Sequence, residues 1–314
     1  MSTLLDILIP TYNRAVYLEK NIQLLLSFIE QLNIKDKVKI IVSNNASTDN
    51  TAKILKNFNN DNLIVYTQKI NLGLEKNAVY CLSKSNAKFC MFLGDDDYID
   101  ILYLKEVIQY IKNYTDITCV IPSITSIDIN GNHIKGSIGR DLNNPTKIYK
   151  KGLETAQKLF QKGHQLSGVT FLREETLETY LNSGYRNIYL FMYFVGFNCL
   201  RGDTVHLTQY PVKVTQPLQE NKDWGYGDDG LIPERLKNCH AIFKGNKREI
   251  LKAEKFIIMM DRGFGYRYLN KGIKCFLKYI FLILKTKNCS LQAKIYFLSI
   301  ASVIFIKYYL INNK

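Results

Sequence analysis

The chain has 314 residues, of which 42 are Lys or Arg and 28 are Asp or Glu, so its formal net charge is +14. With 46% hydrophobic and 22% charged residues, the composition excludes a disordered chain, a collagen-like chain and a coiled-coil fibre. The length suits one large domain or two modest ones with a buried core. The positive charge indicates an anionic partner such as nucleic acid, a membrane surface or a phosphorylated substrate.

This charge is concentrated near the C-terminus. Residues 241–314 hold fifteen basic and three acidic side chains, a net charge of +12, which leaves +2 for residues 1–240. No acidic residue follows Asp261. A lysine bias from an AT-rich genome would spread lysine evenly along the chain, so it does not account for this distribution.

The cysteines and the N-terminus indicate where the protein works. The seven cysteines are scattered without a CxxC pair, and no histidine lies close enough to indicate a zinc site, so we expect reduced thiols. Asp6 interrupts the first apolar run and Pro10 follows it, a pattern that does not predict a signal peptide. We expect a cytoplasmic protein that works peripherally at the inner face of the plasma membrane.

The first hundred residues alternate between short apolar runs and helical spacing. Strands are predicted at residues 4–9, 38–42, 63–66 and 89–93, and helices over residues 15–33, 48–58 and 74–85. Ser47 or Thr48 is the expected N-cap of the second helix. This alternation favours parallel βαβ units in an open α/β sheet, whose ligands bind beyond the carboxyl ends of the strands. Polar clusters at residues 11–14, 44–49 and 95–97 fall at those ends.

Three aspartates follow the fourth predicted strand. Clustered carboxylates repel one another unless a cation neutralises them. The spacing of Asp95 and Asp97 therefore suits a site for Mg²⁺ or Mn²⁺ that also contacts a phosphate-bearing ligand. The alternative is a solvated acidic loop in which Asp97 caps a helix that begins near Leu102.

Four segments in this order resemble the nucleotide-sugar half of family-two glycosyltransferases over roughly residues 1–110. The segments are Ile-Pro-Thr-Tyr-Asn-Arg at 9–14, Asn-Asn-Ala-Ser-Thr-Asp at 44–49, Asn-Leu-Gly at 71–73 with Asn77, and Phe-Leu-Gly-Asp-Asp-Asp at 92–97. The Leu-Gly-Asp-Asp-Asp and Ser-Asn-Asn-Ala-Ser forms are more similar to abequosyltransferase-like members than to cellulose or chitin synthases. The resemblance implies a GT-A fold, an α/β Rossmann-like open and mostly parallel sheet, here with a helical basic C-terminal extension.

The resemblance also implies roles for individual residues. The donor, a nucleotide-diphosphate sugar, would contact Pro10, Thr11, Tyr12, Arg14, Asn44, Asn45, Asn71, Gly73, Asn77, Asp95 and Asp96. Asp97 and Asp95 would hold the divalent metal, Mn²⁺ or Mg²⁺, which offsets the charge on the departing nucleoside diphosphate. Asn44 stands where the family commonly has an aspartate that reads the base, so the identity of the nucleotide stays open.

Residues 166–175 also resemble the family, at the turn and strand that lead into the acceptor site. We therefore divide the chain into a nucleotide-sugar half at residues 1–110, an acceptor half at 111–240 and a basic helical region at 241–314. The expected acceptor-side residues are His164, Ser167, Gly168 and Trp224.

The general base is the main departure from the family pattern. Members usually carry a Glu-Asp pair some 10–30 residues further on, but no Asp or Glu occurs between Thr179 and Gly202. A base has to lie within hydrogen-bond reach of the acceptor hydroxyl. We favour Asp228 or Asp229, in a Gly-rich loop that would otherwise be a plain surface turn. The remaining options are Asp203, Asp223, no carboxylate base, or retention of configuration. The aromatic residues at 189–194 are expected in the core.

The basic tail has the spacing of interfacial helices. On a helix over residues 267–285, the five basic side chains lie within about 60° of one another. The twelve uncharged residues at 295–306 are too few to span a bilayer, which takes about 20. These features predict helices that lie on an anionic membrane surface. The alternative is a helical hairpin packed on the catalytic domain with its lysines in water.

The sequence thus predicts a metal-dependent glycosyltransferase. It would move a sugar from a nucleotide-diphosphate donor to a glycan, lipid-linked acceptor in bacterial lipopolysaccharide or other surface polysaccharide synthesis. A nucleotidyltransferase of sugar phosphates is a second option, but residues 10–14 lack the glycine of a phosphate loop. A nucleic-acid-binding protein ranks last, because the tail is apolar between its charges and has no RNA-reading module. We therefore expect no nucleic-acid partner.

Overall fold

The computed structural model describes residues 3–134, 139–216, 232–260 and 272–312. The chain forms two units. Unit 1 comprises Met1–Asn182 and Leu190–Glu220, and unit 2 comprises Ser183–Tyr189 and Asn221–Lys314. The division of the chain at residues 110 and 240 stays a prediction.

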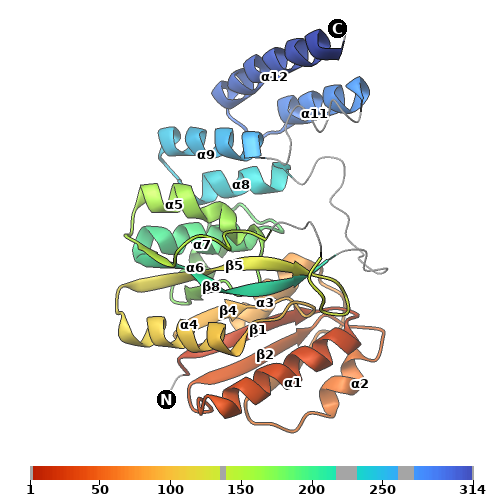
Figure 1. Ribbon diagram of the computed structural model, residues 1–314, viewed down its shortest axis with the longest axis vertical. Helices are drawn as coiled ribbons and strands as arrows, with labels where there is room; N and C mark the ends of the chain where they lie inside the picture. Colours follow the sequence, from red (N-terminus) through yellow and green to blue (C-terminus); the bar gives the residue numbers. More distant parts are fainter. Residues whose placement is uncertain (1–2, 135–138, 217–231, 261–271, 313–314) are drawn as a thin grey trace. The chain divides into compact units, whose positions relative to one another are not determined.

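Unit 1 is built on an eight-stranded sheet of order β3-β2-β1-β4-β7-β5-β8-β6 (Figure 1). The strands are β1 (Leu5–Thr11), β2 (Val38–Asn44), β3 (Leu63–Thr67), β4 (Phe89–Phe92), β5 (Ile117–Ile127), β6 (Lys147–Tyr149), β7 (Thr170–Leu172) and β8 (Asp203–Thr215). The short strands β6 and β7 pair antiparallel with their neighbours, and the other pairings are parallel. The predicted open, mostly parallel sheet is confirmed.

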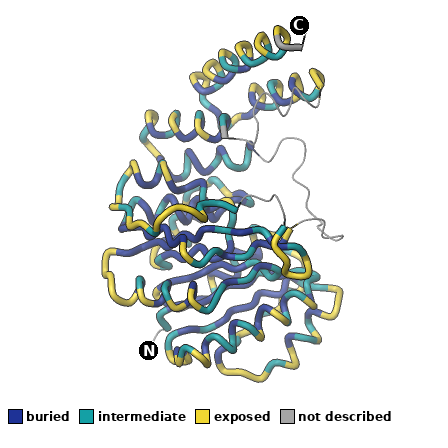
Figure 2. The backbone as a smooth tube through the Cα atoms, in the orientation of Figure 1, coloured by how far each residue is buried: buried dark blue, intermediate teal, exposed yellow. Residues whose placement is uncertain are grey.

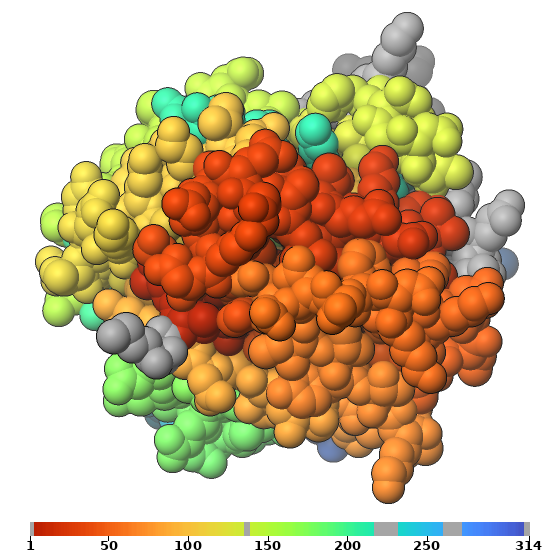
Figure 3. Space-filling model, turned by 90° about the horizontal axis from the view of Figure 1, so that it is seen from below, coloured from red at the N-terminus to blue at the C-terminus, as the bar shows by residue number. Residues whose placement is uncertain are grey.

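Helices cover both faces of this sheet. They are α1 (Ala15–Gln31), α2 (Thr51–Lys56), α3 (Leu74–Ser83), α4 (Ile101–Asn113), α5 (Leu153–Leu159), the 3₁₀ helix η1 (Phe160–His164), α6 (Thr176–Asn182) and α7 (Leu190–Arg201). The predicted helices and strands of the first hundred residues are confirmed to within a few residues. Figure 3 shows a face on which this N-terminal part of the chain, drawn red to orange, makes up much of the visible surface.

The predicted cap of the second helix is wrong. Helix α2 begins at Thr51, and the Asp49 carboxylate, not Ser47 or Thr48, accepts a hydrogen bond from the Thr51 backbone N–H at 2.9 Å. The Ser47 hydroxyl instead accepts from the Asn13 N–H at 2.9 Å. This turn therefore ties the ends of β1 and β2 together.

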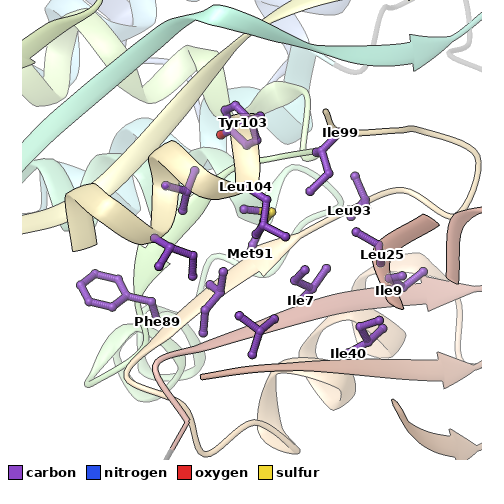
Figure 4. Close-up of a cluster of buried hydrophobic side chains, with 14 of the residues drawn as sticks. Ile7, Ile9, Leu25, Ile40, Phe89, Met91, Leu93, Ile99, Tyr103 and Leu104 are labelled. Atoms are coloured by element: carbon purple, nitrogen blue, oxygen red, sulfur yellow. The ribbon is translucent and has the colours of Figure 1, made fainter. Parts of the chain in front are cut away.

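The alternation along β1 explains how the two sides of the sheet are filled. Ile7 and Ile9 point to one face, where they share a buried cluster with α1 and with Leu104 of α4 (Figure 4). Figure 2 shows the central strands as a continuous buried layer. Burying this many aliphatic side chains is the main source of stability for unit 1, and it fixes the strand ends that carry the site.

The opposite face is packed by an aromatic cluster. Phe92 of β4 lies 4.8 Å from Phe191 and 6.1 Å from Phe194, measured between ring centroids, and 6.0 Å from Phe171 of β7. All four side chains are at most 3% exposed. The prediction that the aromatic residues at 189–194 belong to the core is confirmed.

Unit 2 contains the helices α8 (Ile232–Ile242), α9 (Lys247–Met260), α11 (Ile273–Lys285) and α12 (Leu291–Asn312). Its centre is the fully buried carboxylate of Glu254 in α9. This carboxylate contacts His240 Nε2 at 3.0 Å and accepts hydrogen bonds from the Ser290 N–H at 3.0 Å and the Ser290 hydroxyl at 2.5 Å. Ser290 immediately precedes α12, so Glu254 fixes the start of this helix on α9.

Helix α12 corrects one expectation from the sequence. It runs for 22 residues and continues past Lys294 and Lys307, which gives a length of about 33 Å at 1.5 Å per residue. Counting only the uncharged residues between the two lysines therefore underestimated the helix. Among the described residues, Leu291–Leu310 is one helix whose length and composition would allow it to cross a membrane.

Candidate functional site

The candidate site lies where three neighbouring parallel strands end. Thr11 at the end of β1 pairs with Asn44 at the end of β2, and β4 leads directly into the loop that carries Asp95. The chain proceeds from β1 to β2 and β3 on one side, and then returns to place β4 on the other side of β1. Such a reversal opens a crevice beyond the strand ends in which open α/β sheets bind ligands.

Asp97 is buried, and hydrogen bonds hold both of its carboxylate oxygens. Oδ1 accepts from the Thr215 backbone N–H at 2.9 Å, and Oδ2 accepts from Gln165 Nε2 at 3.2 Å and from the Ser167 hydroxyl. Its side chain is 5% exposed. The carboxylate therefore joins the loop after β4 to the end of β8 and to the turn before β7.

The alternative role given to Asp97 from the sequence is excluded, because a different residue caps α4. The Asp100 carboxylate accepts a hydrogen bond from the Leu102 backbone N–H at 2.8 Å.

Asp95 is half-buried beside two further carboxylates. Burial, and then the negative charges of Asp96 and Asp97, raise the pKa of Asp95 to about 8, and the nearby Thr11 and Arg14 oppose this shift only in part. Asp96 is held through its backbone, since its carbonyl oxygen accepts a hydrogen bond from the Thr215 hydroxyl. A carboxyl group with a raised pKa beside other carboxylates is a position at which a cation is strongly favoured.

The ends of β1 and β2 are cross-linked around this edge. Asn13, at a φ of 53°, accepts a hydrogen bond from the Thr48 N–H at 2.8 Å, and Arg14 donates its backbone N–H to Thr51. Pro10 pairs with Ser43 in the sheet, and Tyr12 is half-buried in the loop after β1. These contacts hold the first polar segment over the crevice.

A set of asparagines shapes the β2 side. Asn45 donates to Asn71 Oδ1 at 2.8 Å and accepts from the Leu72 N–H at 2.8 Å, which fixes the loop before Gly73. Asn77 accepts from the Ser43 hydroxyl at 2.6 Å. Gly73, at a φ of 79°, precedes α3 in a conformation that suits glycine.

Asn44 is the most distinctive of these residues. Its side chain is fully buried, and Oδ1 accepts from the Ser47 N–H at 3.0 Å. This bond assigns the other side-chain atom as nitrogen, and that Nδ2 has no hydrogen-bond partner. The aspartate expected here from the family pattern would present an acceptor, whereas Asn44 presents a donor.

Two of the predicted acceptor-side residues lie close to Asp97 or to β8: Ser167 contacts the Asp97 carboxylate, and Gly168 packs against Val212 of β8. The Ser167 hydroxyl bonds Asp97 and also accepts from the Gly94 N–H at 2.9 Å. Gly168, at a φ of 81°, comes so close to Val212 that a Cβ there would lie 2.6 Å from a Val212 methyl group. His164 is exposed at the end of η1, next in sequence to Gln165.

The structure also identifies site residues that the sequence did not indicate. Gln165 and Thr215 bind Asp97, and Asn21 of α1 donates to the carbonyl oxygens of Gly94 and Asp97 at 3.0 and 2.9 Å. Asn21 had a detectable signal, because it is a polar residue on the apolar face of α1 beside Leu18 and Ile22.

The candidate bases divide into two groups. Asp203 lies at the start of β8, at the opposite end of this strand from Thr215, and binds Lys150 at 2.7 Å. It is therefore wrong as a base for this site. The other candidates, together with the predicted acceptor-side tryptophan, lie outside the described residues: Asp223, Trp224, Asp228 and Asp229.

The residues around Asp95 fit a divalent cation that a substrate helps to bind. Within the described ranges, no group of three or more His, Cys, Asp or Glu side chains could hold a metal ion by itself. Mg²⁺ commonly binds through one or two carboxylates, with phosphates and water completing its coordination. Asp95 supplies one such carboxylate with a raised pKa, and Asp97 adds a second carboxylate two residues further along the same loop.

A mostly parallel open sheet with an acidic loop at the reversal of strand order defines an α/β protein of the GT-A type. Residues 6–181 match the family described as Glycosyl transferase family 2. Since this match covers more than half of the chain, the chain belongs to glycosyltransferase family 2.

Curated relatives support the same grouping. Abequosyltransferase RfbV of Salmonella typhimurium is 33% identical over 116 residues, which are 36% of this chain and 33% of that protein. A GalNAc(5)-diNAcBac-PP-undecaprenol beta-1,3-glucosyltransferase of Campylobacter jejuni is 31% identical over 153 residues, 47% of this chain and 46% of that protein. The chain therefore spans less than half the length of either relative. The expected similarity to abequosyltransferases is confirmed.

Solved structures confirm the fold. The structure of S. aureus TarS 1–349 in complex with UDP-GlcNAc matches with a TM-score of 0.66 at 17% identity, covering 90% of this chain and 80% of that one. The mannosyltransferase PcManGT from Pyrobaculum calidifontis, in complex with GDP-Man and Mn²⁺, matches with a TM-score of 0.53 at 13% identity, covering 98% and 82%.

Proposed function

We propose that this protein transfers a sugar from a nucleotide-diphosphate sugar to a glycan acceptor in bacterial surface polysaccharide synthesis. The observation that carries the proposal is the convergence of Asp95–Asp97 with Thr11 and Asn44 at the reversal of strand order. Strands lie about 4.8 Å apart, so a nucleoside that reaches from β4 across β1 to β2 fits this edge. The activities named for the relatives, an abequosyltransferase and a glucosyltransferase of a lipid-linked glycan, support this reaction class.

We further propose that Asp95 and Asp97 bind Mn²⁺ or Mg²⁺ together with the donor diphosphate. Bound there, the metal would offset the charge that develops on the leaving nucleoside diphosphate. Thr11 and Arg14 would face the nucleoside, and Asn44 would contact the base. The turn of Ser167 and Gly168 would lie on the acceptor side, together with His164, which precedes this turn. Asp228 or Asp229 remains the proposed general base and Trp224 the proposed acceptor-side aromatic.

A thermal-shift screen tests the donor proposal. UDP-, GDP-, CDP- and dTDP-sugars are added to the protein with Mn²⁺ and then with EDTA. We expect at least one donor to raise the melting temperature in the presence of Mn²⁺ only. The Asp95→Asn variant should lose this response, because it removes the carboxylate without changing the size of the side chain. Absence of any shift with all four donors would contradict the proposal.

We also propose that unit 2 attaches the enzyme to the cytoplasmic face of an anionic membrane. On α11, four exposed apolar side chains form one stripe at helical spacing: Ile273, Leu277, Phe281 and Leu284. Lys274, Lys278 and Lys285 lie along one side of this stripe, and Lys285 Nζ lies 4.2 Å from the Phe281 ring centroid. Interfacial helices place apolar side chains in the acyl boundary and lysines at the headgroups. A lipid-linked acceptor would be reached from this surface.

Vesicle flotation tests the attachment. We expect the full chain to float with vesicles containing anionic phospholipid, and less with purely zwitterionic vesicles. Replacing Leu277 and Phe281 with Ser should reduce flotation. The matched control is Val16→Ser, which removes an apolar side chain of unit 1 that is 77% exposed. Equal flotation of the Leu277/Phe281 variant and the control would contradict the proposal.

A further inference from the structure

A cluster of basic side chains surrounds one carboxylate beside the candidate site. Asp141 Oδ2 lies 2.5 Å from Lys162 Nζ, 3.3 Å from His206 Nε2 and 3.6 Å from Arg140 Nε. The other carboxylate oxygen accepts a hydrogen bond from Asn144 Nδ2 at 3.0 Å. Three basic groups therefore share a single oxygen, and Lys162 has the shortest contact with it.

Of the three basic groups around Asp141, Arg140 makes the longest contact with the carboxylate. Its Nε and Nη2 atoms are buried and have no hydrogen-bond partner. Its Nη1 lies 3.3 Å from Nδ1 of His164, but the same Nδ1 lies 2.9 Å from the carbonyl oxygen of Gln161. A carbonyl oxygen only accepts, so Nδ1 has to donate its proton to Gln161 and then cannot accept from Arg140.

The cluster carries more positive than negative charge. Burial lowers the pKa of His206 to about 4, so His206 is neutral near pH 7, and it lowers the pKa of Arg140 to about 10, so Arg140 stays cationic. Arg140 and Lys162 together oppose only Asp141. Keeping a partly buried cation that shares its one carboxylate with a second cation is costly. The Arg140 side chain is 21% exposed, so a ligand can reach it.

Arg140 lies at the same edge of the sheet as the carboxylate loop. Its backbone exchanges both hydrogen bonds with Ile124 of β5, at 2.9 and 3.1 Å. Ile124 is three residues, or about 10 Å, before the end of β5. His164, which lies beside the Arg140 guanidinium, is followed in the chain by Gln165, and the Gln165 side chain binds Asp97. The cluster thus lies on the β5 side of Asp97, away from β2 and the proposed nucleoside position.

We propose that Arg140, with Lys162 and His164 beside it, binds the diphosphate that joins the acceptor glycan to its lipid. This inference rests on the proposed sugar transfer. An arginine guanidinium stays cationic and binds phosphate oxygens through charge-assisted hydrogen bonds. The donor diphosphate has its own counter-charge in the metal at Asp95 and Asp97, so the two diphosphates would be bound on opposite sides of Asp97.

Calorimetry with farnesyl diphosphate in EDTA tests the site without the donor metal. We expect saturable binding to the wild-type protein and at least tenfold weaker binding to Arg140→Gln. Arg140→Lys should give an intermediate loss, since it keeps the charge but not the guanidinium. Lys147→Gln removes one exposed positive charge of the same unit, and Asp95→Asn changes the donor site, so both should bind like the wild type. Melting temperatures establish that each variant is folded.

Three results would overturn the inference: no binding of farnesyl diphosphate, equal binding by Arg140→Gln, or displacement by inorganic phosphate at equal concentration. The last result would identify a free-phosphate site. The donor screen separates the two proposals. A wild-type protein that responds to a donor with Mn²⁺ but fails these tests refutes the diphosphate site alone, whereas no response to any donor refutes the proposed function itself.

Discussion

Replacing Asp97 with Ala should destabilise unit 1 strongly, because the carboxylate connects three segments that are far apart in the chain. The substitution removes the acceptor of the Thr215 N–H, the Gln165 amide and the Ser167 hydroxyl. Hydrogen bonds to a charged group are worth about 1.5–3 kcal/mol each. The substitution also relieves the repulsion between Asp97 and Asp95. Because these effects oppose one another, we expect the free energy of unfolding to fall by about 3 kcal/mol.

Urea unfolding followed by far-ultraviolet circular dichroism measures this change. Ser167→Ala provides the second arm of a double-mutant cycle, since its hydroxyl binds both Asp97 and the Gly94 N–H. The loss in the double variant should be smaller than the sum of the single losses by about 1–2 kcal/mol. If Asp97→Ala unfolded within about 1 kcal/mol of the wild type, or if the two losses were additive, Asp97 would not connect these segments.

Two further predictions concern the same unit. Burial and Asp96 raise the pKa of Asp95 to about 8, above about 3.9 in an unfolded chain. The folded state thus keeps a proton that the unfolded chain releases, and wild-type stability should fall as the pH rises between these two values, whereas Asp95→Asn should lack this decline. Melting temperatures near pH 5 and near pH 8 check this, and parallel profiles for the two proteins would argue against a raised pKa. Phe194→Ala should cost about 3–5 kcal/mol in urea unfolding, because Phe194 is fully buried against Phe92 and Phe171, and a loss below about 1 kcal/mol would contradict the aromatic packing.

The sequence predicts the central sheet well because the responsible signals are local. Each of β1, β2 and β4 is an apolar run that ends in a polar cluster, and the alternation with helices determines that these strands are parallel. Strands β6 and β7 have three residues each, too few for any periodicity to be recognised. Their antiparallel pairing depends on tertiary contacts.

The candidate site likewise has a part that the sequence predicts and a part that depends on tertiary contacts. The acidic loop and the segment around Asn44 lie in local motifs, so their positions follow from the sequence. Thr215 binds Asp97 across 118 residues of chain and Gln165 does so across 68, and no local pattern encodes such partners. The pairing of Asp141 with Arg140, Lys162 and His206 likewise arises only after β5, β8 and η1 are packed together.

We propose above all that the acidic loop after β4 binds a nucleotide-diphosphate sugar through a divalent metal. Isothermal titration calorimetry of the donor that gives the largest thermal shift tests it most directly, with Mn²⁺ or EDTA, on the wild type and on Asp95→Asn. We predict saturable binding to the wild type with Mn²⁺, and at least tenfold weaker binding in EDTA or after the substitution. Equal affinity in all of these conditions would refute metal-dependent donor binding at this loop.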